Sequence, residues 1–158
     1  MRVDDVALIE RWDADPDVAA FGGGIDWYDW PVELARDVAW RELLIAEETG
    51  RPVGFVQLID AAMEEEHYWG DVEPGTWAID IWLGSPADRG RGVGTSVMTI
   101  ALDRCFDDHG ARVVLIDPLI TNERAIRFYR RLGFVPVGER WFGDDHCHVH
   151  RLDRPANG

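Results

Sequence analysis

The sequence predicts an α+β domain built on one mixed sheet. Two observations lead to this prediction: several short segments alternate apolar with polar residues, and other segments have apolar residues at helical spacing. Turns rich in glycine, proline and aspartate favour antiparallel hairpins between some strands, whereas helices connect others. The expected order is helix, helix, strand, strand, strand, helix, strand, helix, strand, strand.

The length of 158 residues suits one domain with a substantial core. We expect this domain to span residues 1–154, followed by a frayed tail over 155–158. No apolar run is long enough to cross a membrane, and the first residues lack the apolar core of a signal peptide. Cys105 and Cys147 make no disulfide framework, so we expect two free thiols in a cytoplasmic protein.

The formal charge of −14 restricts the possible partners. Nucleic acids and anionic membranes attract basic surfaces, so we expect neither as a partner. An acidic protein instead favours a cationic ligand, although the same charge also serves solubility alone.

The first half of the chain is predicted to hold two helices and a hairpin. The helices are expected over residues 4–12 and 31–41, and the strands over 43–48 and 53–60. Between the helices, residues 21–30 combine three glycines with aromatic residues. This loop either folds over a ligand or is pinned to the core by its tryptophans.

Residues 61–75 form a long acidic linker around a Tyr68-Trp69 pair. Carboxylates beside aromatic rings can bind a polycation through ion pairs and cation–π contacts. On this interpretation Trp69 and Glu73 contact the ligand. The alternative is a solvated acidic loop whose Trp69 packs down locally.

The central stretch over 77–105 contains a strand, a turn and a helix. The strand places Trp77, Ile79, Ile81 and Leu83 on one face, and Ala78, Asp80 and Trp82 on the other. The turn that follows has three glycines and two arginines. Because the first turn of a helix has free N–H groups and the positive end of the dipole, this turn is predicted to bind phosphate. The alternative is a glycine-rich turn whose arginines serve solubility.

The turn reads Arg89-Gly90-Arg91-Gly92-Val93-Gly94. It is no Walker A motif, because no lysine follows Gly94, and its glycine spacing differs from the dinucleotide fingerprint. The turn resembles the Arg/Gln-x-x-Gly-x-Gly/Ala pyrophosphate loop of the GCN5-related N-acetyltransferases (GNAT), which bind acetyl-coenzyme A.

A second signature lies in the last part of the chain. A strand over 112–116 ends at Asp117-Pro118, a helix runs from Thr121 or Asn122 to Leu132, and strands follow over 134–141 and 146–152. The segment 122–134 is similar to the Asn-x-x-Ala-x-x-x-Tyr-x-x-x-Gly-Phe element of the same family.

The resemblance covers residues 34–152 and implies the GNAT fold. That fold is a mixed, mostly antiparallel sheet, splayed between the strands at 77–83 and 112–116, with helices on both faces. The family strand ahead of the first helix is expected to be missing or very short. The pantetheine arm would lie in the gap, and Tyr129 would act as general acid at the thioester sulfur. The implied cofactor contacts are Ile81, Trp82, Leu83, Arg89, Gly90, Arg91, Gly92, Val93, Gly94, Thr95, Asn122 and Tyr129.

Within the family, residues 73–80, 90–95 and 117–127 are most similar to the aminoglycoside 6′-N-acetyltransferases, which are resistance enzymes. Asp80 and Asp117 match two carboxylates that hold and help deprotonate the amine. Asp80 would be the general base, because an amine attacks only when neutral. Asp117, Trp69 and Glu73 would bind the substrate. The plainer alternatives are a polar strand residue for Asp80, a turn residue for Asp117 and a core-edge aromatic for Tyr129.

The sequence therefore predicts an acetyl-CoA-dependent N-acetyltransferase for a cationic small-molecule amine, an aminoglycoside first. Transfer would be direct in a ternary complex, by a monomer or weak homodimer. Alternative acceptors are a polyamine, a siderophore hydroxylamine or a protein N-terminus, and a further alternative is a CoA-binding module without catalysis. We expect no metal: His146, His148 and His150 would lie roughly 7 Å apart along a strand, which we expect to be an exposed edge.

Overall fold

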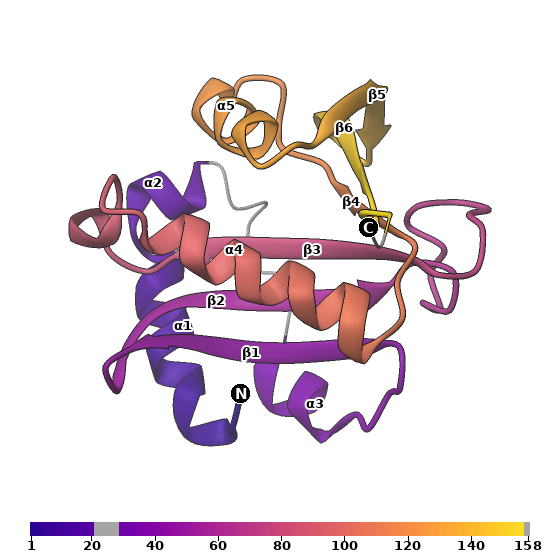
Figure 1. The fold of residues 1–158 in the computed structure, drawn as a ribbon. Coiled ribbons are helices and arrows are strands. Elements are labelled where there is room, and N and C mark those ends of the chain that lie inside the picture. The colour runs from indigo at the N-terminus through magenta and orange to yellow at the C-terminus, as the bar shows by residue number, and fades with distance from the viewer. Residues whose placement is uncertain (21–28, 157–158) are drawn as a thin grey trace.

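The computed structural model describes residues 1–20 and 29–156 (Figure 1). The sequence interpretation of the glycine-aromatic loop therefore falls almost wholly outside the described residues. In the described part, six strands form one sheet in the order β1-β2-β3-β4-β6-β5. The strands are β1 (Arg41–Glu48), β2 (Arg51–Asp60), β3 (Thr76–Leu83), β4 (Val113–Ile116), β5 (Val135–Phe142) and β6 (Asp145–Asp153). Neighbours run antiparallel except β3 and β4, which confirms the predicted mixed sheet.

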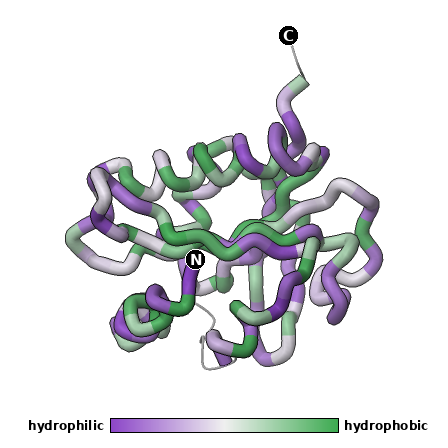
Figure 2. Tube along the Cα trace, turned by 90° about the horizontal axis from the view of Figure 1, so that it is seen from below, coloured by the Kyte–Doolittle hydropathy of each residue, from purple (hydrophilic) through white to green (hydrophobic). Residues whose placement is uncertain are grey.

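Helices cover both faces of the sheet, as predicted. They are α1 (Val6–Asp13), α2 (Pro16–Ala19), α3 (Trp30–Ala35), α4 (Val93–Asp103) and α5 (Glu123–Arg131). Figure 1 shows α4 crossing one face, and Figure 2 shows the sheet between α4 and the pair α1 and α3. Short 3₁₀ turns span Val3–Asp5 and Pro86–Asp88, and α4 continues into a π-helical turn over Arg104–Asp108. None of the helices in the described ranges is long and apolar enough to span a membrane.

One helix is shorter than the sequence predicts. The helix expected over 31–41 ends at Ala35; irregular chain and a turn over 36–40 follow it, and β1 begins at Arg41. The carbonyl of Trp40 accepts from Asp60 N at 2.8 Å, and the buried guanidinium of Arg41 pairs with Glu33 at 2.7 Å. Strand pairing and this ion pair outweigh local helix propensity.

The sheet splits between β3 and β4. Only Thr76–Ala78 of β3 pair with Val113–Leu115 of β4, whereas β3 pairs with β2 as far as Leu83. The carbonyl of Thr76 accepts from Ala61 N, on the β2 side, and Gly84 N donates to β2. Because backbone groups alternate in direction along a strand, those of Ile81 and Leu83 point toward the split. The splayed sheet predicted from the resemblance is thus present.

Three apolar clusters form the core of the described residues. The largest cluster lies under α4 and α5 and includes Ile79, Met98 and Val114. On the opposite face, one cluster gathers around Trp12, Trp30 and Phe55, and another around Trp69 and Ala78. These last two clusters flank the part of the sheet where Asp80 and Asp117 lie.

The strand with the three histidines is not an exposed edge, contrary to the sequence prediction. β6 lies between β4 and β5, and β5 is the edge. Pairing between strands distant in the sequence sets this order: β6, the second strand of the last hairpin, pairs with β4, and β5 does not. His150 is fully buried, and the described residues hold no cluster suited to a metal. Cys105 and Cys147 are both free, as expected, and both are buried.

Candidate active site

Two carboxylates face each other where the sheet splits. The parallel register pairs Thr76 with Val113 and Ala78 with Leu115, so counting on by two places Asp80 level with Asp117. Both side chains project on the face opposite α4, since Ile79 and Ile116 on the alternate positions belong to the core under that helix. The register thus brings together two residues that lie far apart in the sequence.

The environment of these carboxylates raises their pKa values. Burial raises the pKa of Asp80 to about 6. Burial and the neighbouring charge of Asp80 raise the pKa of Asp117 to about 7. Two like charges held close together in a partly dry site resist simultaneous ionisation, and a bound cation relieves that repulsion. The pair therefore forms a binding point for a positive charge with at least one group able to accept a proton near neutral pH.

Tyr129 of α5 lies next to the same carboxylates. Its side chain is buried beside Phe128 and Phe134, at ring distances of 5.2 and 5.8 Å. Burial, together with the charges of Asp80 and Asp117, raises the pKa of its phenol. The hydroxyl therefore stays protonated at neutral pH and can act as a proton donor.

The N-terminus of α5 is fixed by Asn122. Its side-chain oxygen accepts from Ala125 N at 3.1 Å, so it caps the helix as the sequence predicts. Gly133 follows the helix with a φ of +95°, the left-handed conformation expected after its last turn.

The glycine-arginine turn opens α4 as predicted. Gly90 and Gly92 have φ values of +74° and +84°, and a Cβ at either would meet open space. Gly92 caps the helix without a side-chain hydrogen bond, so the first N–H groups, of Val93, Gly94 and Thr95, remain available. Two open left-handed glycines at an uncapped helix N-terminus fit a bound phosphate group.

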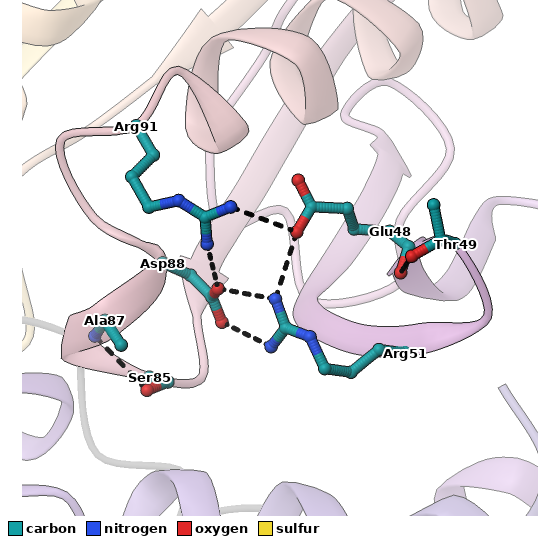
Figure 3. Close-up of polar contacts among 7 residues, drawn as sticks. All are labelled: Glu48, Thr49, Arg51, Ser85, Ala87, Asp88 and Arg91. Atoms are coloured by element: carbon teal, nitrogen blue, oxygen red, sulfur yellow. Dashed lines mark hydrogen bonds and ion pairs between the residues drawn. The ribbon is translucent and has the colours of Figure 1, made fainter.

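Asp88 anchors this turn to the neighbouring hairpin (Figure 3). Its carboxylate is 2% exposed and accepts two hydrogen bonds from Arg51, at 2.9 and 2.7 Å. Arg91 pairs with the same carboxylate at 3.3 Å and with Glu48 at 3.6 Å. The hydrogen bonds from Arg51 hold the pKa of Asp88 below its usual range. The turn is therefore tied to β1 and β2 through a charged buried side chain.

Other residues from the sequence prediction lie elsewhere. The backbone groups of Trp82 face β2, away from the split, and its ring packs against Phe55 with the ring centroids 4.3 Å apart and the planes tilted by 35°. Glu73 precedes the opposite end of β3, where it lines a cavity of about 400 Å³ with Arg112 and Arg151. The side chain of Arg89 is mostly covered and lies 3.8 Å from Asp15.

The acidic loop contributes a different aromatic residue from the one predicted. Trp69 is buried in the core, which is the alternative weighed for it in the sequence. Tyr68 instead reaches the carboxylate pair, and its hydroxyl donates to Asp117 Oδ2 at 2.7 Å. Sequence reasoning recognised the Tyr-Trp pair but carried no signal for which ring faces the site. It also missed Arg51 and Asp88, which no motif singles out.

The family of the chain follows from a match over most of its length. A model of the acetyltransferase (GNAT) domain matches residues 2–142. The chain belongs to the GNAT family.

Similar proteins include enzymes that act on aminoglycosides. The chain is 32% identical over 95 residues to an aminoglycoside N(6′)-acetyltransferase type 1 of Klebsiella pneumoniae, covering 60% of this chain and 47% of that protein. It therefore spans about half the length of this curated relative. The crystal structure of aminoglycoside acetyltransferase AAC(6′)-Ib with coenzyme A matches with a TM-score of 0.85 and 25% identity, covering 98% of this chain and 92% of that one. A structure of the same enzyme with paromomycin and acetyl-CoA matches with a TM-score of 0.84, 25% identity and coverages of 98% and 90%.

Proposed function

We propose that the protein is an acetyl-CoA-dependent N-acetyltransferase that acts on a cationic small-molecule amine, with an aminoglycoside 6′-amine as the leading acceptor. The observation that carries the proposal is the facing pair of Asp80 and Asp117 at the split of the sheet. The similarity to aminoglycoside acetyltransferases supports this acceptor class. The net charge of −14 also favours a polycation, because it attracts such a substrate from solution.

The cofactor would lie along the split and the turn before α4. Backbone groups of Ile81 and Leu83 would pair with its extended arm, as an added strand would. The amides of Val93, Gly94 and Thr95 would hold the pyrophosphate, with Arg91 beside them. Asn122, at the start of α5, would contact the cofactor from the other side of the split.

The chemistry follows from the three titratable groups. Acetyl-CoA, when bound, supplies an activated acetyl thioester. Asp80 and Asp117 hold the substrate ammonium, and Asp80 takes one proton from it, since a base with a pKa of about 6 is stronger than an ordinary carboxylate. The neutral nitrogen then forms the new C–N bond to the acetyl carbon as the C–S bond breaks, and the second proton of the nitrogen passes to solvent when the amide forms. A backbone N–H near Ile81 or Leu83 stabilises the oxyanion, and Tyr129 protonates the departing thiolate.

The state of the two cysteines favours direct transfer without an acyl-enzyme intermediate. Both thiols are buried, and burial raises the pKa of each to about 12. A thiol attacks as its thiolate, so neither group is activated as an acyl carrier.

The function is tested by thiol release from acetyl-CoA with a panel of acceptors. The panel holds kanamycin, tobramycin, spermidine, a hydroxylamine siderophore precursor and short peptides. Turnover of the aminoglycosides is the expected result. Turnover of another amine alone would overturn the aminoglycoside assignment and retain the acetyltransferase, whereas CoA binding without any turnover would favour a binding module.

The pH dependence follows from the raised carboxylate pKa values. Asp80 accepts a proton only when ionised, and Asp117 attracts the ammonium only when ionised. We therefore expect kcat/KM to rise with pH through the range of about 6 to 7 and to fall below it. Initial rates at low substrate concentration between pH 5 and 9 give this profile. A profile that is flat down to pH 5 would exclude both carboxylates as groups that must be ionised.

Removing the charge of Asp88 should weaken cofactor binding. Asp88→Asn breaks the shared carboxylate between Arg51 and Arg91 and loosens the turn that holds the pyrophosphate. We expect the Kd for coenzyme A, measured by calorimetry, to rise about tenfold, which corresponds to ~1.4 kcal/mol. The matched control is Glu48→Gln, which removes an exposed partner of the same two arginines and should change the Kd less. Equal Kd values for Asp88→Asn and wild type would contradict this role.

A further inference from the structure

The acidic loop over residues 61–75 is held in place by a buried carboxylate. Glu64 is 6% exposed, and its two oxygens accept hydrogen bonds from the backbone N–H groups of Tyr68 and of Glu66, the latter at 3.1 Å. A buried carboxylate that accepts backbone hydrogen bonds fixes the path of the chain around it. The position of Tyr68 is thus set by the loop itself.

The ring of Tyr68 is packed as firmly as its backbone. It stacks on Phe142 of β5 at 4.2 Å with an interplanar angle of 5°, and it meets the edge of Trp69 at 5.4 Å. Arg140 strengthens this group, because it donates to the carbonyl of Trp69 at 2.7 Å and lies over the ring of Phe142 at 4.9 Å. The side chain of Tyr68 therefore has a defined direction although 45% of the residue is exposed.

The hydroxyl of Tyr68 ends on the carboxylate pair. It donates to Asp117 Oδ2 at 2.7 Å, a bond that favours the ionised form of that carboxyl. Several other groups act on Asp117 or sense its charge. Asp80 on β3 and Asp145 at the start of β6 oppose its ionisation, and the charge of Asp117 in turn raises the pKa values of Tyr129 on α5 and Cys147 on β6.

We propose that Tyr68 is a positioning residue of the acceptor site, which holds Asp117 ionised and oriented opposite Asp80 so that the pair receives the cationic amine. This inference rests on the proposed function, because it assigns Tyr68 a part in binding the same substrate. Tyr68 acts through Asp117 and has no role in the proton transfers assigned to Asp80 and Tyr129.

Tyr68→Phe isolates this role, since it keeps the ring on Phe142 and removes only the donor. Without the hydrogen bond the pKa of Asp117 rises further, so a smaller fraction is ionised near neutral pH. For the aminoglycosides we expect kcat/KM to fall about tenfold at pH 6.5, mainly through KM, and to recover to within about threefold at pH 9. Trp141→Phe is the control: it changes an exposed ring on β5 and should leave the profile unmoved.

A double-mutant cycle decides whether Tyr68 works through Asp117. In an Asp117→Asn background, Tyr68→Phe should have little further effect on KM, because the carboxylate that it serves is gone. Full additivity of the two changes, or a Tyr68→Phe profile that superimposes on that of the wild type, would overturn the proposal.

A second measurement tests the role of Tyr68 independently of the proposed acetyltransferase function. Carboxyl ¹³C NMR titration of the free protein, with the Asp117 signal assigned by Asp117→Asn, reports its pKa without any substrate. We expect Tyr68→Phe to shift that titration to higher pH, and an unchanged titration would overturn the role of Tyr68. If the wild type turns over no aminoglycoside, the proposed substrate fails, and the titration still decides the Tyr68–Asp117 contact.

Discussion

Asp80→Asn should lower kcat/KM for the acceptor by about 10²- to 10⁴-fold, the range typical for loss of a general base. The amide keeps the size of the side chain but cannot take a proton from the ammonium, and it leaves Asp117 as a single charge. Steady-state thiol release at pH 8, with the preferred acceptor, measures the loss. Asp60→Asn is a suitable control, because Asp60 lies at the end of β2 in register with Trp77, and its carboxylate accepts from Ala62 N at 3.1 Å, outside the site.

Asp80→Asn should also be more stable than the wild type at pH 8. The pKa of Asp80 in the fold is about 6, above its ordinary value near 3.9 in the unfolded chain. Folding favours the protonated form of Asp80. The stability that this preference contributes is therefore full below pH 4 and is lost as the pH rises through 6. At pH 8, Asp80→Asn should raise the free energy of unfolding by about 1 to 3 kcal/mol. An inactive variant that is also destabilised at pH 8 would point to a folding defect instead of a lost base.

Gly84→Ala should cause the largest loss of stability among the glycine positions at the site. A Cβ at Gly84 would lie 1.9 Å from Cε2 and 2.1 Å from Nε1 of Trp12, whose ring closes the core under α1. A rigid buried indole cannot move aside without shifting α1, so we expect a loss of about 2 to 3 kcal/mol in urea unfolding. The loss should lower the denaturation midpoint without changing the slope.

Gly94→Ala provides the matched control. Its Cβ would meet Leu83 and Phe128 at 3.7 Å, an ordinary contact, and Gly94 lies in the first turn of α4. Alanine in a helix is favoured over glycine by roughly 0.5 to 1 kcal/mol, so this variant should be as stable as wild type or slightly more so. Equal midpoints for Gly84→Ala and Gly94→Ala would contradict the packing argument.

Local patterns account for most of the fold that the sequence predicts. The alternation in β3 and the glycines before α4 act through neighbouring residues, so the sequence indicates them directly. The Asn122 cap is local in the same way. Whether the first or second strand of the last hairpin joins β4 depends on contacts across the sheet, and the edge prediction for β6 was wrong for that reason.

The candidate site was predictable in part for a related reason. Asp80, Asp117 and Tyr129 lie in or beside the two signatures, and the structure brings them together. Trp69 and Tyr68 are neighbours in the chain, but the turns of the acidic loop bury one and direct the other to Asp117. Glu73 precedes the N-terminal end of β3, whereas Asp80 lies toward its C-terminal end. The length of the strand therefore keeps Glu73 away from the site.

The pairing of β3 with β4 also sets a rule for insertions and deletions. Three residue pairs fix the alignment of the two strands, and the site lies two residues beyond the last pair on each side. One residue added between Ala78 and Asp80 would turn the carboxylate to the α4 face, and the strand would remain a strand. An equal change between Leu115 and Asp117 would do the same from the other side. Among homologues, the lengths of these two short intervals should therefore remain fixed where the acceptor is cationic.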